Sequence, residues 1–208
     1  MMRMVLRATR RYGAILLSAL AVASCATQRW EASQPSPWSP SRKPDPTTSL
    51  ATAIPIAVPS GFVLQPPSAG TSGPLDLARA ARADGAADAR RTLVRDGFVG
   101  GYRRQWVKSG HKDENSVLVY KFKTVAGARA YLWYLLPHLL PSTLEPVRFV
   151  VRAVPSASGV RASTPSRSVA VIAFTSGLYV MRVVASAGPR TNQTAVAAEL
   201  SKAIFFGS

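Results

Sequence analysis

Two pairs of strand-like segments, each joined by a short polar turn, dominate the second half of this 208-residue chain. The first pair covers residues 98–107 and 117–123, and the second covers residues 169–175 and 178–186. Apolar and polar residues alternate along these segments with the period of a half-buried strand. Each pair therefore predicts an antiparallel hairpin.

Helical patterns precede, separate and follow the two hairpins. Pro74 stands before the first helical pattern, and Thr124 is placed to cap the third. Between the hairpins we expect one further strand and then a loop of small residues. The order helix, two strands, helix, three strands, helix predicts an α+β fold, with helices packed on an antiparallel sheet of about five strands. The helices are expected at 75–81, 86–95, 125–136 and 192–205, the further strand at 147–153 and the loop at 155–168.

The first 25 residues have the layout of an export signal. Four arginines and no acid occupy residues 1–12, and an apolar run follows from Gly13 to Ala23. This run is too short for a membrane-spanning helix of about 20 residues. Residues 22–25, Val-Ala-Ser-Cys, resemble the lipobox of bacterial lipoproteins, in which the Cys receives a diacylglyceryl group and becomes the mature N-terminus. The alternative is an ordinary cleaved signal peptide with a chance cysteine.

The lipobox reading places the protein on the outer face of the cell membrane, anchored through lipid on Cys25. Residues 26–74 hold ten of the 16 prolines, together with many Ser and Thr. Such a composition cannot bury enough surface to offset its ordering cost, so it predicts a semi-extended linker. We therefore expect a signal peptide at 1–24, a disordered tether at 25–53 and one α+β domain at 54–208. Within that domain, residues 54–64 favour a docked edge strand that tolerates proline.

The chain is strongly basic, with 26 Lys and Arg against 10 Asp and Glu and a formal charge of +16. Removal of residues 1–24 takes away four arginines and lowers this charge to +12. Anionic partners are favoured by such a charge, and for an exported protein these are envelope lipids or wall polymers rather than nucleic acid. A single Cys excludes both a disulfide framework and a metal site built from cysteines.

The sequence offers little that resembles a catalytic site. No Ser stands in a Gly-x-Ser-x-Gly turn, and no phosphate-binding loop is present. His111 lies in a charged turn, which is more typical of a solvated hairpin tip than of a metal site, and His138 lies at a helix end. The acids Asp76, Asp84 and Asp88 are interpreted as helix caps and solvated positions. We expect no enzyme activity, no catalytic residues, no cofactor and no metal.

Two groups of residues remain as binding candidates. Phe98, Tyr102 and Trp106 alternate onto one face of the first strand, and with Tyr120 and Leu132 the latter two are candidates to line a ligand cavity. The alternative is that these side chains are ordinary core. Five basic residues alternate with core positions and predict one anion-binding sheet face, unless that face is merely solvated. They are Arg103, Lys121, Lys123, Arg148 and Arg152.

Several short phrases carry a family resemblance. Pro59-Ser60-Gly61-Phe62, residues 96–102 (DGFVGGY), residues 126–131 (AGARAY) and residues 176–180 (SGLYV) resemble a group of actinobacterial secreted lipoproteins of uncharacterised function with a PsbP-like α+β domain. The resemblance covers about residues 55–208. It implies a fold and an envelope location, and it implies no catalytic residue.

These observations together predict a lipid-anchored envelope protein that acts as a non-catalytic binding or interaction module. The alternative function is a carrier or sensor that holds a small apolar or lipidic ligand between sheet and helix. A cavity lined by the aromatic group favours the carrier, whereas a packed core with a flat charged face favours the interaction module.

Overall fold

The computed structural model describes residues 50, 51, 54, 61–67, 71–152, 154–189 and 192–207. The expected signal peptide, Cys25 and most of the expected tether lie outside these residues. The strands are β1 (Phe62–Leu64), β2 (Gly73–Leu75), β3 (Phe98–Lys108), β4 (Glu114–Phe122), β5 (Val147–Val150), β6 (Ser158–Ser163), β7 (Ser168–Ser176) and β8 (Tyr179–Ala187). The helices are α1 (Leu77–Asp84), α2 (Ala89–Arg95), α3 (Val125–Leu135), the 3-10 turn η2 (Leu136–His138) and α4 (Gln193–Gly207).

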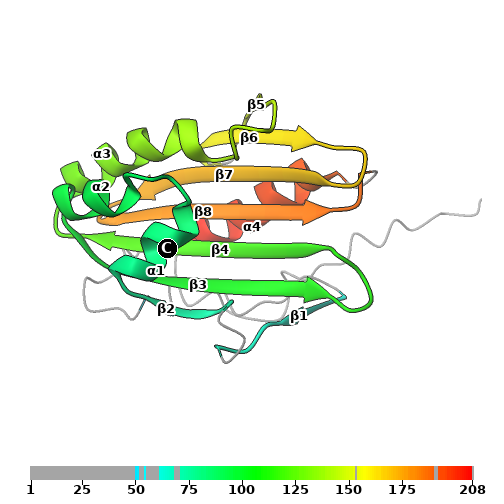
Figure 1. Cartoon of the computed structure of the whole chain (residues 1–208), viewed down its shortest axis with the longest axis horizontal. Helices are drawn as coiled ribbons and strands as arrows, with labels where there is room; N and C mark the ends of the chain where they lie inside the picture. The colour runs from blue at the N-terminus through cyan, green and yellow to red at the C-terminus, as the bar shows by residue number, and fades with distance from the viewer. Residues whose placement is uncertain are drawn as a thin grey trace, which may run out of the picture.

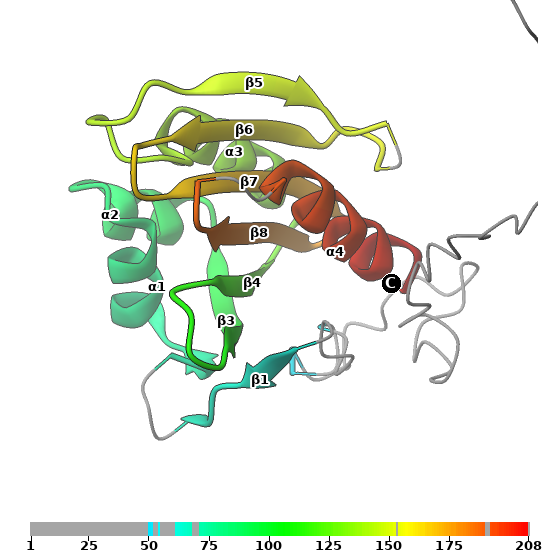
Figure 2. The same cartoon turned by 90° about the vertical axis from the view of Figure 1, so that its right-hand side faces the viewer.

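The strands form one antiparallel sheet of eight strands in the order β1-β3-β4-β8-β7-β6-β5, with β2 also paired to β3. Helices α1, α2 and α3 cover one face of this sheet, and α4 covers the other (Figures 1 and 2). The apolar side chains accordingly form two core layers, one beneath α1–α3 and one beneath α4. The predicted α+β class is confirmed, but the expected number of strands was too low.

The strands that the sequence did not predict are short or poor in β-forming residues. β6 lies inside the segment 155–168 that was expected to be a loop, and its sequence is Ser-Gly-Val-Arg-Ala-Ser. Pairing with both β5 and β7 holds it in the sheet. The ring of Phe149 lies where a Cβ of Gly159 would be, so only glycine allows this close packing between β5 and β6.

The N-terminal end of the described chain is fastened to β3. β1 pairs with β3 at the sheet edge, as the sequence of residues 54–64 favoured. Ile54 is buried in the core beneath α4. The guanidinium of Arg104 donates hydrogen bonds to the carbonyl oxygens of Ile54, at 2.8 Å, and Ala51, at 3.0 Å.

The face expected for Phe98 was wrong. A β-bulge between Phe98 and Gly100 shifts the register of β3 against β4 and reverses the alternation. Phe98 therefore lies beneath α1–α3, where its ring packs edge-on against Tyr120 with centroids 5.6 Å apart. Tyr102 and Trp106 lie on the opposite face, in the core beneath α4.

Asp76 and Thr124 are the caps of α1 and α3, but α1 begins at Leu77 and not at the expected residue 75, because Leu75 belongs to β2. The Asp76 carboxylate accepts a hydrogen bond from the Arg79 amide at 2.8 Å, and the Thr124 hydroxyl accepts one from the Gly127 amide at 3.0 Å. Gly85 ends α1 with a φ of 75°, a left-handed conformation that favours glycine. In α2, Leu93 is buried, whereas Val94 is 61% exposed.

Candidate functional site

A groove of about 660 Å³ lies on the face of the sheet that α1–α3 cover. Its floor consists of side chains from neighbouring strands in register. Leu118 of β4 is paired with Arg103 of β3 on one side and with Arg182 of β8 on the other. The next row holds Ser116 of β4 and Val184 of β8. The remaining floor residues are Glu114, Val169 and Val171.

The walls of the groove come from two segments that follow helices. The end of α1 and the turn after it, residues 83–86, form one wall. The stretch 137–142, which covers the end of η2 and the chain beyond it, forms the other. This second wall is mostly apolar, because it contains Pro137, Leu139, Leu140 and Pro141. The groove is thus mainly apolar, with two guanidinium groups on its floor.

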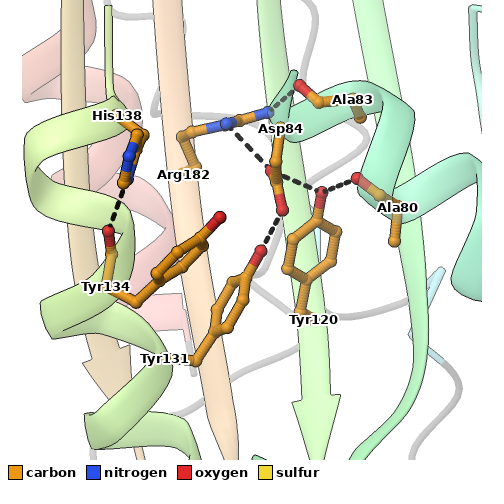
Figure 3. Close-up of polar contacts among 8 residues, drawn as sticks. All are labelled: Ala80, Ala83, Asp84, Tyr120, Tyr131, Tyr134, His138 and Arg182. Atoms are coloured by element: carbon orange, nitrogen blue, oxygen red, sulfur yellow. Dashed lines mark hydrogen bonds and ion pairs between the residues drawn. The ribbon is translucent and has the colours of Figure 1, made fainter. Parts of the chain in front are cut away.

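Asp84 is the centre of a buried polar cluster at one wall (Figure 3). Its carboxylate forms an ion pair with Arg182 at 3.0 Å and accepts hydrogen bonds from the hydroxyls of Tyr120, at 2.9 Å, and Tyr131. Arg182 also donates to the carbonyl oxygen of Ala83 at 2.7 Å. These contacts fasten the C-terminal end of α1 to β4, β8 and α3.

The same cluster sets the protonation of its tyrosines. Burial raises the pKa of Tyr120 and of Tyr131 far above the ordinary value, and the adjacent Asp84 carboxylate raises both further. Both hydroxyls therefore remain protonated donors and cannot serve as bases. The Asp84 carboxylate has three partners, so it is a structural group rather than a free acid at the groove wall.

Sequence reasoning missed Asp84 and Arg182. Asp84 was interpreted as a solvated helix position, yet its side chain is fully buried. The signal that could have found the pair is in β8, where Arg182 interrupts the otherwise apolar run Tyr179–Val184. A charged residue within a buried strand requires an opposite charge nearby.

His138 lies at the rim of the groove without a catalytic neighbour among the described residues. Its Nδ1 lies 2.8 Å from the carbonyl oxygen of Tyr134. Ser142 also lines the groove, but no hydrogen bond joins it to His138 in the described part of the chain.

The described residues also contain no group of three or more His, Cys, Asp or Glu that could hold a metal ion. His111 is exposed in the turn after β3. The expectation that the protein is not an enzyme stays a prediction.

The four residues expected to line a cavity do not meet. Tyr102 and Trp106 lie beneath α4, whereas Tyr120 and Leu132 lie beneath α1–α3. The cause is the register of the hairpin, in which Tyr102 is paired with Val119 and not with Tyr120. Paired residues share a face, so Tyr102 and Tyr120 point to opposite sides of the sheet. None of the four residues lines the groove.

The five basic residues expected on one face are likewise divided. Arg103 is paired with Leu118 and lies in the groove, on the face that α1–α3 cover. Lys121 lies on the other face, where its ammonium is 5.9 Å from the centre of the Tyr179 ring. Lys123 and Arg152 are exposed beyond the ends of β4 and β5, and Arg148 is exposed on the edge strand β5. The predicted flat anion-binding face is therefore not formed by these five residues.

Comparison with known proteins identifies no family for this chain. No protein-family model and no curated protein matches the sequence. The fold is similar to the extracellular domain of PknH from Mycobacterium tuberculosis, at 12% identity and a TM-score of 0.46, over 69% of this chain and 84% of that chain. A likeness this distant carries no conclusion about function. No helix among the described residues has the length and apolar character needed to cross a membrane.

Proposed function

We propose that this chain is an exported binding module whose groove holds a small apolar or lipidic ligand between the sheet and the helices. The observation that carries the proposal is the groove itself, a space of about 660 Å³ with a largely apolar lining. Its size is within the range of small-molecule sites, and its few polar groups stand at defined positions on rigid strands. Of the two functions considered from the sequence, the carrier or sensor is thus supported better.

The second candidate, an interaction module that binds an anionic envelope lipid or wall polymer through a charged sheet face, has weaker support. Its five basic residues are divided between both faces and the edge of the sheet. The proposed location rests on the sequence alone. The lipobox at residues 22–25 supports a lipid anchor at Cys25 on the outer face of the cell membrane, with no nucleic-acid partner.

A neutral apolar dye tests the proposal without involving charge. We expect Nile red to bind the purified full-length protein with a rise in fluorescence. Val184 is a half-buried floor residue, so Val184→Phe extends a ring into the groove and reduces dye affinity by about tenfold or more, which corresponds to a loss of at least about 1.4 kcal/mol.

The matched control is Val150→Phe, because Val150 is 83% exposed on β5 and does not line the groove. This variant should bind the dye as the unchanged protein does. Absence of dye binding, or equal binding by both variants, would contradict the proposed function.

A further inference from the structure

Arg103 differs from the other arginine on the floor of the groove. The guanidinium of Arg182 is bound to the Asp84 carboxylate and to a helix-terminal carbonyl. In contrast, no hydrogen bond or ion pair among the described residues includes the guanidinium of Arg103. Its Nε is buried without a partner, as is the Nε of Arg182. The groove therefore contains one guanidinium, that of Arg103, without an ion pair among the described residues.

The electrostatic surroundings of Arg103 favour an anion. Burial lowers the pKa of Arg103 and the charge of Arg182 lowers it further, whereas Glu114 and, to a smaller extent, Tyr120 raise it. Glu114 itself is engaged by the Arg167 guanidinium at 3.4 Å and by the Gln105 side-chain amide at 3.4 Å. A half-buried guanidinium without a direct anionic partner is costly, and a bound anion offsets this cost.

A second opening gives solvent access to the same side chain. A cavity of about 540 Å³ beside β2 and α1 is also lined by Arg103, together with the exposed Arg79 and Arg82. Arg79 is 4.0 Å from Asp76, whereas no carboxylate of the described chain lies within ion-pair distance of Arg82. These arginines add positive potential on the outer side of Arg103, which attracts anions toward it.

On the basis of the proposed function, we infer that the ligand of the groove is an anionic amphiphile whose carboxylate or phosphate binds the Arg103 guanidinium. The apolar part of this ligand lies along Leu118, Val171 and Val184. The planar guanidinium presents parallel N–H donors that match either anion in a two-point contact. A fatty acid and a monoacyl phosphate share this chemistry.

Calorimetric titration of the purified full-length protein with decanoate, decyl phosphate and decanol tests the inference. Each of the three ligands contains ten carbon atoms, and they differ in head group. We expect decanoate or decyl phosphate to bind at least about tenfold more tightly than decanol, as for a hydrogen bond to a charged group. The tighter of the two anions identifies the head group, and either result supports the inference. Arg103→Gln should remove the preference for the anions over decanol.

Two further variants keep this test interpretable. Arg148→Gln removes the same charge from the exposed strand β5 and should retain the full preference. Arg103→Lys keeps the charge without the planar donor pair, so it should retain part of the preference. Thermal unfolding of each variant checks that the fold is intact.

The failures of the two proposals are distinguishable. If decanol binds as tightly as the anions, or if Arg103→Gln keeps the preference, the inference is overturned while the proposed function stands. If none of the three ligands binds, the proposed function fails and the inference fails with it. If inorganic phosphate displaces decanoate as effectively as decyl phosphate does, the site binds a free anion and the inferred amphiphile is wrong.

Discussion

At the scale of single residues, Asp84 occupies a position that is unfavourable by itself. It is the last residue of α1, where the helix dipole places partial negative charge, and its carboxylate is fully buried. The contact with Arg182 and the two tyrosine hydroxyls compensates for both penalties. Because the charges are buried together, removal of one partner leaves the other without compensation.

We therefore predict that Asp84→Asn lowers the free energy of unfolding by about 3–5 kcal/mol, the usual cost of an unpaired buried charge. Urea unfolding followed by circular dichroism measures this loss. Arg91→Gln is the control, because the Arg91 side chain is 84% exposed and lies 3.8 Å from Asp88. That change should alter stability by less than about 1 kcal/mol. Equal losses in the two variants would show that the Asp84 cluster does not hold α1 on the sheet.

The Asp84–Arg182 pair also marks the limit of prediction from sequence at this scale. The local helix caps at Asp76 and Thr124 were predictable, because each bonds an amide three residues away. The partner of Arg182 was not, because it lies on another element far along the chain. Its choice depends on where α1 crosses the sheet, which no local pattern reports.

At the scale of elements, a hydrogen bond between Tyr134 and Asp88 joins α3 to the start of α2. The Tyr134 hydroxyl of α3 donates to the Asp88 carboxylate, just before α2, at 2.6 Å. This bond lowers the pKa of Asp88 below its ordinary value of 3.8. Burial, followed by the contact with Asp88, raises the pKa of Tyr134 to about 12. The hydrogen bond is therefore fully formed at neutral pH, and it depends on the ionised carboxylate of Asp88.

The sign of the resulting pH dependence follows from the depressed pKa of Asp88. The stabilisation is fully present above the unfolded pKa of about 3.8 and is lost as the pH falls through the lower folded value. We predict that Tyr134→Phe destabilises the protein at pH 7, and that this difference shrinks below pH 3.8. Thermal unfolding of both proteins at a series of pH values measures it. A difference that stays constant down to pH 2 would contradict the assigned role of Asp88.

The positions of most long elements were predictable from the sequence, but the side of the sheet to which each strand residue points was not. Period-two alternation located β3, β4, β7 and β8, and helical spacing located all four helices. The bulge at the start of β3 and the pairing of Tyr102 with Val119 were not visible in the sequence. A register shift of one residue exchanges every side chain between the faces of a sheet. For this reason the predicted cavity residues were divided, and Arg103 lies apart from the other four basic residues with which it was grouped.

At the scale of the whole molecule, the two faces of the sheet are covered differently. On one face, α4 contributes Leu200 and Ile204 to a continuous apolar core. On the other, the end of α1 and the chain after α3 form the two walls of the groove. The groove is thus a product of helix placement on the sheet, and it combines residues from segments that the sequence does not connect. This explains why the lining of the groove was not predictable from the sequence.

The proposed anchor acts on the molecule as a whole. If Cys25 carries a diacylglyceryl group, several acyl chains hold the protein at the membrane, because each buried methylene contributes about 0.8 kcal/mol. We therefore predict that the protein from the native membrane fraction begins at Cys25 and that its intact mass includes the lipid. Cys25→Ala should release the protein to the soluble fraction. Ser24→Ala, which keeps a small residue before the cysteine, should leave both lipidation and membrane association unchanged. An unmodified chain that begins at Ser24 would instead identify a freely secreted basic protein and would contradict the anchor, without affecting the groove.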